Sequence, residues 1–131
     1  MSTITYAKGK EFPKEEYSLA FRKLRFHEKL PESYVQILQA HYNAPGRRMT
    51  PTQLAEAANW ENYSAVNLHY GLLGKMVCEE LGYVPEDYTS QGERNYTCGI
   101  AWGERETPES EWIWTMYDNL AQAIKELGIV S

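Results

Sequence analysis

Cysteine and histidine are scarce in this sequence, and it contains no long apolar segment. Its two cysteines, Cys78 and Cys98, and three scattered histidines do not form the paired spacing of a zinc site. No stretch approaches the roughly 20 apolar residues that a membrane helix needs, and Met1–Lys10 lacks the apolar core of a signal peptide. We therefore expect a cytoplasmic protein with no membrane contact, with reduced cysteines and with no metal or other cofactor.

The residue patterns of catalysis are also missing. Gly71–Lys75 has the wrong spacing for a phosphate-binding loop and lies inside a predicted helix. Adjacent acids such as Glu79 and Glu80 point about 100° apart on a helix, so they do not form a carboxylate pair. We therefore predict that the chain is not an enzyme.

Charge is divided unevenly along the chain. Residues 1–48 carry nine Lys or Arg and five Asp or Glu, a net charge of +4, and residues 49–131 carry four and thirteen, a net charge of −9. The total is the net charge of −5. Either the two parts form separate surfaces of opposite sign, or their charges intermix on an ordinary solvated surface after folding.

Apolar spacing and capping residues predict a mainly helical chain that begins with an edge strand near Thr3–Tyr6. Thr50 and Gln53 form the signature of a capping box, and Gly71, Gly74 and Cys78 indicate that another segment, most simply a partner helix, packs closely. The predicted helices are Lys14–Leu24, Pro31 to about Tyr42, Pro51–Ala58, Ser64 to about Leu81, and one capped by Asp118 that ends near Leu127. Two strands, Asn95–Trp102 and Glu111–Met116, would flank a loop at Gly103–Ser110.

The order of these elements is typical of a helix-turn-helix unit followed by a wing. We predict an α+β fold that is mainly helical and winged-helix-like, with a late β-hairpin. Residues 1–29 would form a basic N-terminal arm and helix, and residues 30–131 the winged-helix-like part of a single domain.

This order makes the helix from Ser64 and the basic residues the candidate DNA-binding surface. Asn67 can pair with adenine, and Ser64 can bond to phosphate. Because the helix has one basic residue, other bases must supply phosphate contacts. The candidate nucleic-acid-binding residues are Lys8, Lys10, Lys14, Arg22, Lys23, Arg25, Arg47, Arg48, Ser64, Asn67 and Lys75.

The acidic part of the chain leads to a second hypothesis. Residues 79–111 hold nine acids and two bases, a surface that can occupy the basic groove of a nucleic-acid-binding protein complex. The chain would then be a phage or mobile-element inhibitor of the anti-CRISPR or anti-restriction type. Its protein-binding residues would be Glu104, Glu106, Glu109 and Glu111. A merely solubilising acidic surface is the simpler alternative.

Several short segments carry a family resemblance: Leu30–Pro31, His41–Gly46, Thr52–Ala57, Asn67–Gly74, Glu80–Tyr83 and Trp112–Met116. Together they resemble an accessory domain of bacterial proteins that also carry an HNH nuclease domain, over roughly residues 30–130. The resemblance implies a DNA-facing, restriction-related accessory role. This chain has no HNH segment and no zinc-holding cysteine pairs, so nuclease activity is not carried over.

Overall fold

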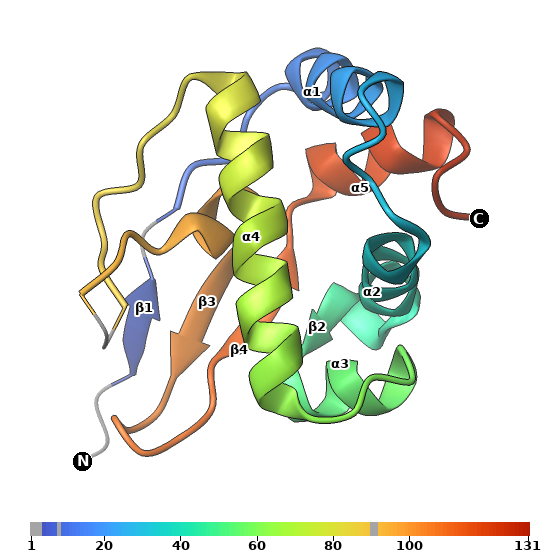
Figure 1. The fold of residues 1–131 in the computed structure, drawn as a ribbon. Helices are drawn as coiled ribbons and strands as arrows, with labels where there is room; N and C mark the ends of the chain where they lie inside the picture. The colour runs from blue at the N-terminus through green and yellow to red at the C-terminus, as the bar shows by residue number, and fades with distance from the viewer. Residues whose placement is uncertain (1–3, 8, 90–91) are drawn as a thin grey trace.

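The computed structural model describes residues 4–7, 9–89 and 92–131. These residues form five α-helices, two 3-10 helices (η) and a four-stranded antiparallel sheet, so the chain is α+β as predicted (Figure 1). None of the helices in this part of the chain has both the length and the apolar composition needed to span a membrane. In order, the elements are β1 (Thr5–Ala7), α1 (Lys14–Phe26), α2 (Glu32–Asn43), η1 (Pro45–Arg47), β2 (Arg48–Met49), α3 (Pro51–Ala57), α4 (Tyr63–Leu81), η2 (Tyr96–Gly99), β3 (Ala101–Arg105), β4 (Ile113–Met116) and α5 (Asp118–Glu126).

The sheet joins segments that are far apart in the sequence. Its strand order is β1-β3-β4-β2, and every neighbouring pair is antiparallel. Strands β3 and β4 form the late hairpin that the sequence predicted, with Trp102 opposite Thr115. The outer strands come from before α1 and from between α2 and α3, and Tyr6 of β1 lies opposite Glu104. The register therefore determines which residues share each face of the sheet.

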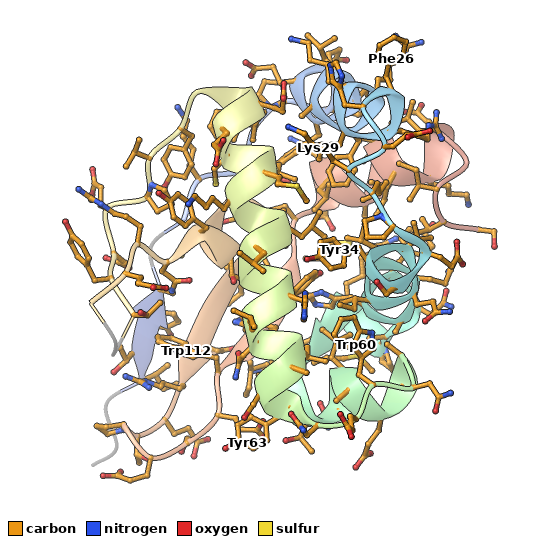
Figure 2. The ribbon with its side chains drawn as sticks, viewed as in Figure 1. Phe26, Lys29, Tyr34, Trp60, Tyr63 and Trp112 are labelled. Carbon is orange, nitrogen blue, oxygen red and sulfur yellow. The ribbon has the colours of Figure 1, made fainter. Side chains whose placement is uncertain are left out.

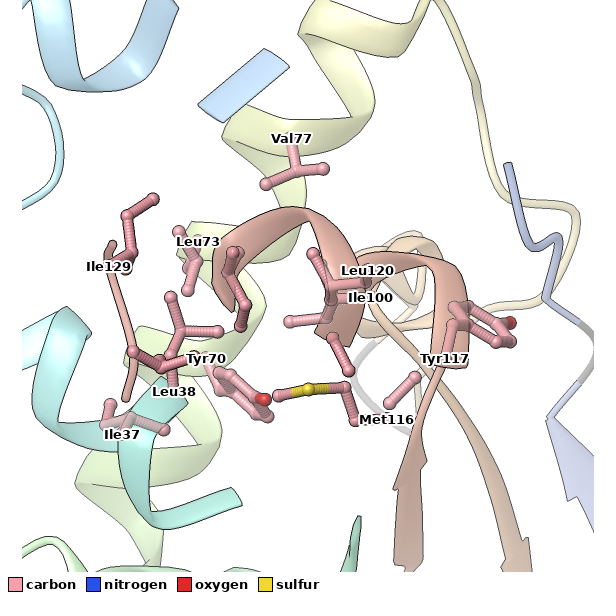
Figure 3. Packing of buried hydrophobic residues seen from close by; sticks show 14 of the residues in the cluster. Ile37, Leu38, Tyr70, Leu73, Val77, Ile100, Met116, Tyr117, Leu120 and Ile129 are labelled. Atoms are coloured by element: carbon pink, nitrogen blue, oxygen red, sulfur yellow. The ribbon is translucent and has the colours of Figure 1, made fainter. Parts of the chain in front are cut away.

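One hydrophobic core holds the helices on one face of the sheet. Helix α4 crosses that face (Figure 1), and Leu38, Tyr70, Leu73, Ile100 and Leu120 meet beneath it (Figure 3). All five are fully buried, and burying one such side chain stabilises the fold by roughly 1.5–3 kcal/mol. Helix α1 contributes to the same core, so the predicted N-terminal segment packs with residues 30–131. Its buried residues are Tyr17, Ala20, Phe21 and Leu24.

The predicted helix ends are confirmed in two places and wrong in two. The Thr50–Gln53 capping box is present, and Gly82 ends α4 with a left-handed φ of 69°. Helix α4 is capped by Asn62, whose Oδ1 accepts from the Ala65 amide at 3.0 Å, and not by Ser64, which lies in the first turn. Asp118 was predicted to cap α5, but no side-chain hydrogen bond caps the start of this helix.

The start of α5 is instead held by the N-terminal segment. The Asn119 amide donates to the Glu11 carboxylate at 2.9 Å. Asp118 is the first residue of the helix, and the capping position is Tyr117. A carboxylate at a helix N-terminus satisfies a free amide and interacts favourably with the helix dipole, wherever in the sequence it comes from. The error therefore reflects a contact that no local pattern reveals.

The first strand of the predicted hairpin, Asn95–Trp102, is also wrong over most of its length. Tyr96–Gly99 is a 3-10 helix, and β3 begins at Ala101. This turn packs against Gly74, where a Cβ atom would lie 2.4 Å from the Tyr96 carbonyl oxygen. Gly74 of α4 thus admits η2, a 3-10 turn, where a partner helix was expected. The hairpin loop also differs from the predicted Gly103–Ser110, because β3 continues to Arg105 and β4 begins at Ile113.

Candidate functional site

The two arginines before α3 both face acids. The guanidinium of Arg47 lies 4.8 Å from the centre of the Tyr42 ring and 3.7 Å from the Asp118 carboxylate. Arg48, on β2, donates to the Glu104 carboxylate on the neighbouring part of the sheet. These contacts occupy both side chains that the sequence nominated as phosphate ligands.

The bases of α1 make contacts of the same kind. Lys14 lies 3.2 Å from Glu126, and Lys23 lies 4.0 Å from Glu80. Arg25 donates to the Leu127 carbonyl at 2.8 Å, at the C-terminal end of α5. Each of the four ion pairs found in residues 4–7, 9–89 and 92–131 joins a base before residue 49 to an acid after it. The charges that are segregated along the sequence therefore intermix in space.

Two further basic candidates, Lys10 and Arg22, form no ion pair with a described residue. Lys10 lies 4.8 Å from the centre of the Phe12 ring, and Arg22 is exposed on α1. Lys8 lies outside the described residues. Ion pairs therefore neutralise Lys14, Lys23, Arg47 and Arg48, whereas Lys10 and Arg22 keep an uncompensated charge.

The predicted recognition helix does present one face to solvent. Ser64, Asn67 and Lys75 are exposed on α4, and the Lys75 Nζ lies 5.8 Å from the Tyr96 ring centre. The same helix exposes Leu68 by 60% and Leu72 by 42%. Figure 2 shows Tyr63 at the foot of this helix, near the hairpin. The exposed surface of α4 thus includes two leucines, whereas a helix that reads DNA usually presents several polar or basic side chains.

The four acids of the second hypothesis divide into two kinds. Glu104 is ion-paired, and Glu111 accepts from the Thr52 amide at 3.0 Å and the Thr52 hydroxyl at 2.7 Å. Glu106 and Glu109 are exposed in the turn between β3 and β4, and neither forms an ion pair with a described residue. We call these two residues the hairpin acids. They are charges available to a partner.

An aromatic surface on the sheet was missed by the sequence reading. Alternation along β3 places Ala101 and Gly103 against the core and turns Trp102 to the opposite face. The Tyr6 ring lies 6.1 Å from the Trp102 ring, between ring centres. Ile113 and Thr115 lie on this side of β4. Alternating side chains around Trp102 were the signal in the sequence for this surface. That alternation shows neither where the strand begins nor which of its two sides faces solvent.

The buried titratable side chains His41, Cys78 and Cys98 lie in the protein interior. His41 is fully buried, with Nδ1 2.6 Å from the Tyr70 hydroxyl and Nε2 3.0 Å from the Trp114 carbonyl. Burial lowers the pKa of His41 to about 4. Cys78 and Cys98 are both free and buried, and burial raises the pKa of each thiol to about 12. Both thiols are therefore protonated and weakly nucleophilic at neutral pH.

Two hollows open beside α3. One, of about 540 Å³, lies between β2 and α3 and is lined in part by Arg48, Met49 and Glu56. The other, of about 600 Å³, lies between α2 and the Ala57–Asn59 turn, with Ile129 at its edge. Neither is lined by a histidine, cysteine or lysine of the described residues. Within those residues, no three His, Cys, Asp or Glu side chains gather as ligands for a metal ion.

Comparisons with protein-family models, with curated proteins and with solved structures found no match to this chain. The resemblance to a restriction-related accessory domain therefore stays a prediction.

Proposed function

We propose that this chain is a non-enzymatic binding domain for a basic, nucleic-acid-binding protein, which it contacts through the hairpin acids. One observation carries the proposal: four bases of residues 1–48 (Lys14, Lys23, Arg47 and Arg48) are paired with acids of residues 49–131, whereas Glu106 and Glu109 stay exposed and form no ion pair with a described residue. A domain of this kind would act as an inhibitor of a nucleic-acid-targeting complex, of the anti-CRISPR or anti-restriction type. Complementary charge would speed its encounter with a basic partner.

The order of elements adds support from topology. The elements follow the order α2, β2, α3, α4, β3, β4, and β2 pairs with β4. We propose that this arrangement is a winged helix. In that arrangement α4 is the recognition helix and the β3–β4 hairpin is the wing. A wing that carries Glu106 and Glu109 would repel the phosphates that a DNA-binding wing contacts. The same acids would attract a protein whose groove normally holds those phosphates.

Neutralising the hairpin acids tests this proposal. We expect Glu106→Gln/Glu109→Gln to weaken binding of a nona-arginine peptide about tenfold, since two exposed ion pairs contribute up to about 1 kcal/mol each. Fluorescence anisotropy of the labelled peptide measures the affinity. Glu104 and Glu111 are left unchanged because their side chains hold Arg48 and Thr52.

The matched control is Glu15→Gln/Glu16→Gln. It removes the same two charges from exposed positions in the first turn of α1, at the opposite end of the molecule from the hairpin (Figure 1). Its affinity should stay within about twofold of the unmodified protein. Equal weakening by both double variants would mean that the peptide senses net charge only, and the proposal would be wrong.

DNA binding is the second candidate, favoured by the exposure of Ser64 and Asn67 on α4. Under our proposal the protein does not retard a duplex of about 20 base pairs in a gel, even at about 50 mM salt. If DNA is the ligand, the duplex shifts, and Lys75→Ala lowers the slope of log affinity against log salt by about one. Lys75 is a cleaner test than Arg47 or Arg48, because reversing those charges also breaks contacts within the fold.

A further inference from the structure

The outer face of the sheet, the side away from α4, carries the residues that a protein interface favours. It presents Tyr6, Trp102, Ile113 and Thr115 together with the Arg48–Glu104 ion pair. The opposite face is filled by Trp114, which belongs to the core. We call this set of six residues the outer sheet face.

The outer sheet face leaves aromatic surface in contact with solvent. Tyr6 is 56% exposed, and its ring lies at 31° to that of the half-buried Trp102. Ile4, just before β1, is 41% exposed. Clustered exposed apolar side chains mark interaction sites, and Trp, Tyr and Arg dominate the residues whose truncation costs most binding energy.

Charge next to this face specifies the partner. Arg48 and Glu104 neutralise each other at its centre, and β3 leads directly from Glu104 into the turn that holds the hairpin acids. The result is an aromatic centre beside a negatively charged rim. We infer that the outer sheet face is the central contact for the basic protein partner, with the partner's arginine side chains stacked on Tyr6 and Trp102. This inference rests on the proposed function and adds the position of its main contact.

Arginine fits such a surface better than a nucleic acid does. A guanidinium group stacks on aromatic faces and can also pair with Glu106 or Glu109. Single-stranded nucleic acids also stack on aromatic residues of an open sheet, but they need a basic groove along their phosphates. Here the turn after β3 carries Glu106 and Glu109, whereas Arg105 alternates to the other face of the sheet and lies over the Trp112 ring. A protein partner is therefore the occupant that the charges favour.

The test follows the tryptophan indole and backbone amide signals in ¹⁵N–¹H spectra while nona-arginine is added. We expect the Trp102 indole and the amides of β1 and β3 to shift. Trp102→Thr and Tyr6→Thr, which remove the ring but introduce a β-branched residue that favours a strand, should each weaken binding at least about fivefold. Trp102→Phe keeps an aromatic face and should bind within about twofold of the unmodified protein.

Phe26→Ala is the control, because Phe26 is 82% exposed on α1, far from the hairpin (Figure 2). It should bind as the unmodified protein does. Unchanged affinity in Trp102→Thr and Tyr6→Thr would overturn this inference. It would leave the proposed function intact if Glu106→Gln/Glu109→Gln still weakens binding.

Two further measurements, binding at high salt and addition of an oligonucleotide, distinguish aromatic stacking from ion pairing and a protein partner from a nucleic acid. The loss caused by Trp102→Thr should persist at high salt, whereas the loss caused by neutralising the hairpin acids should shrink. An oligothymidylate of about 12 nucleotides should leave the Trp102 indole signal in place. If the oligonucleotide shifts that signal and nona-arginine does not, the outer sheet face is a single-strand site and the inference is wrong.

Discussion

Alanine in place of Gly74 is expected to lower the free energy of unfolding by about 2 kcal/mol. A Cβ atom at this position would lie 2.4 Å from the Tyr96 carbonyl oxygen and 2.8 Å from its carbon. Both atoms are backbone, so either α4 or η2 must move. Within a helix, alanine is more favourable than glycine by about 1 kcal/mol. This gain is smaller than the cost of separating α4 from η2. Urea denaturation monitored by circular dichroism measures the difference.

Gly71→Ala is the matched control on the same helix. A Cβ atom there would meet only the Thr97 hydroxyl oxygen, at 3.9 Å, which is an ordinary contact. We therefore expect this variant to be more stable than the unmodified protein by up to about 1 kcal/mol. Opposite signs for the two substitutions would confirm the close contact between α4 and η2. Equal effects would show that helix propensity alone governs both sites.

Acidification from about pH 6.5 to pH 4 is expected to remove about 3 kcal/mol of stability through His41 alone. The Trp114 carbonyl can only accept, so the His41 Nε2 carries the hydrogen and Nδ1 accepts from the Tyr70 hydroxyl. Burial lowers the folded pKa to about 4, from an ordinary value of 6.5. Between these values the unfolded chain binds a proton that the folded chain does not. The contribution is therefore complete above about pH 6.5, falls as the pH decreases, and levels off below about pH 4.

His41→Gln isolates this contribution because glutamine does not titrate. The stability difference between the unmodified protein and this variant, measured by urea denaturation at several pH values, should shrink by about 3 kcal/mol between pH 6.5 and pH 4. Acidic side chains titrate in both proteins, so their effect cancels. Parallel curves for His41→Gln and the unmodified protein would contradict the prediction.

Local patterns predicted most helices well, because a helix depends on residues three or four apart. The spacing of Tyr17, Phe21 and Leu24 matches the buried side of α1. Thr50 and Gln53 are three residues apart, and both halves of their capping box form. Gly82 adopts the left-handed conformation that ends α4. In each case the deciding interaction lies within one or two turns of the chain.

Errors arose where a distant segment decided the conformation. Tyr96–Gly99 has strand-like neighbours in Ile100 and Trp102, but its contact with Gly74 makes it a 3-10 turn. The start of α5 is held by Glu11, more than a hundred residues earlier. Neither partner could be identified from the residues that surround these segments.

The candidate surfaces also depend on contacts between residues that are far apart in the sequence. Lys14 and Arg48 are free cations as far as the sequence is concerned, yet their acidic partners lie 112 and 56 residues away. Tyr6 and Trp102 carry no functional signal individually. They become one surface because β1 pairs with β3, which places both rings on the same side of the sheet.

The sequence by itself determined the α+β class, the helical segments and the number of charges of each sign. The tertiary structure decided which charges are neutralised, which acids of the hairpin stay exposed, and which aromatic rings face solvent. The physical reason is that Coulomb attraction and burial depend on distance in space. Helix propensity and capping depend on distance along the chain, which is the distance that a sequence records.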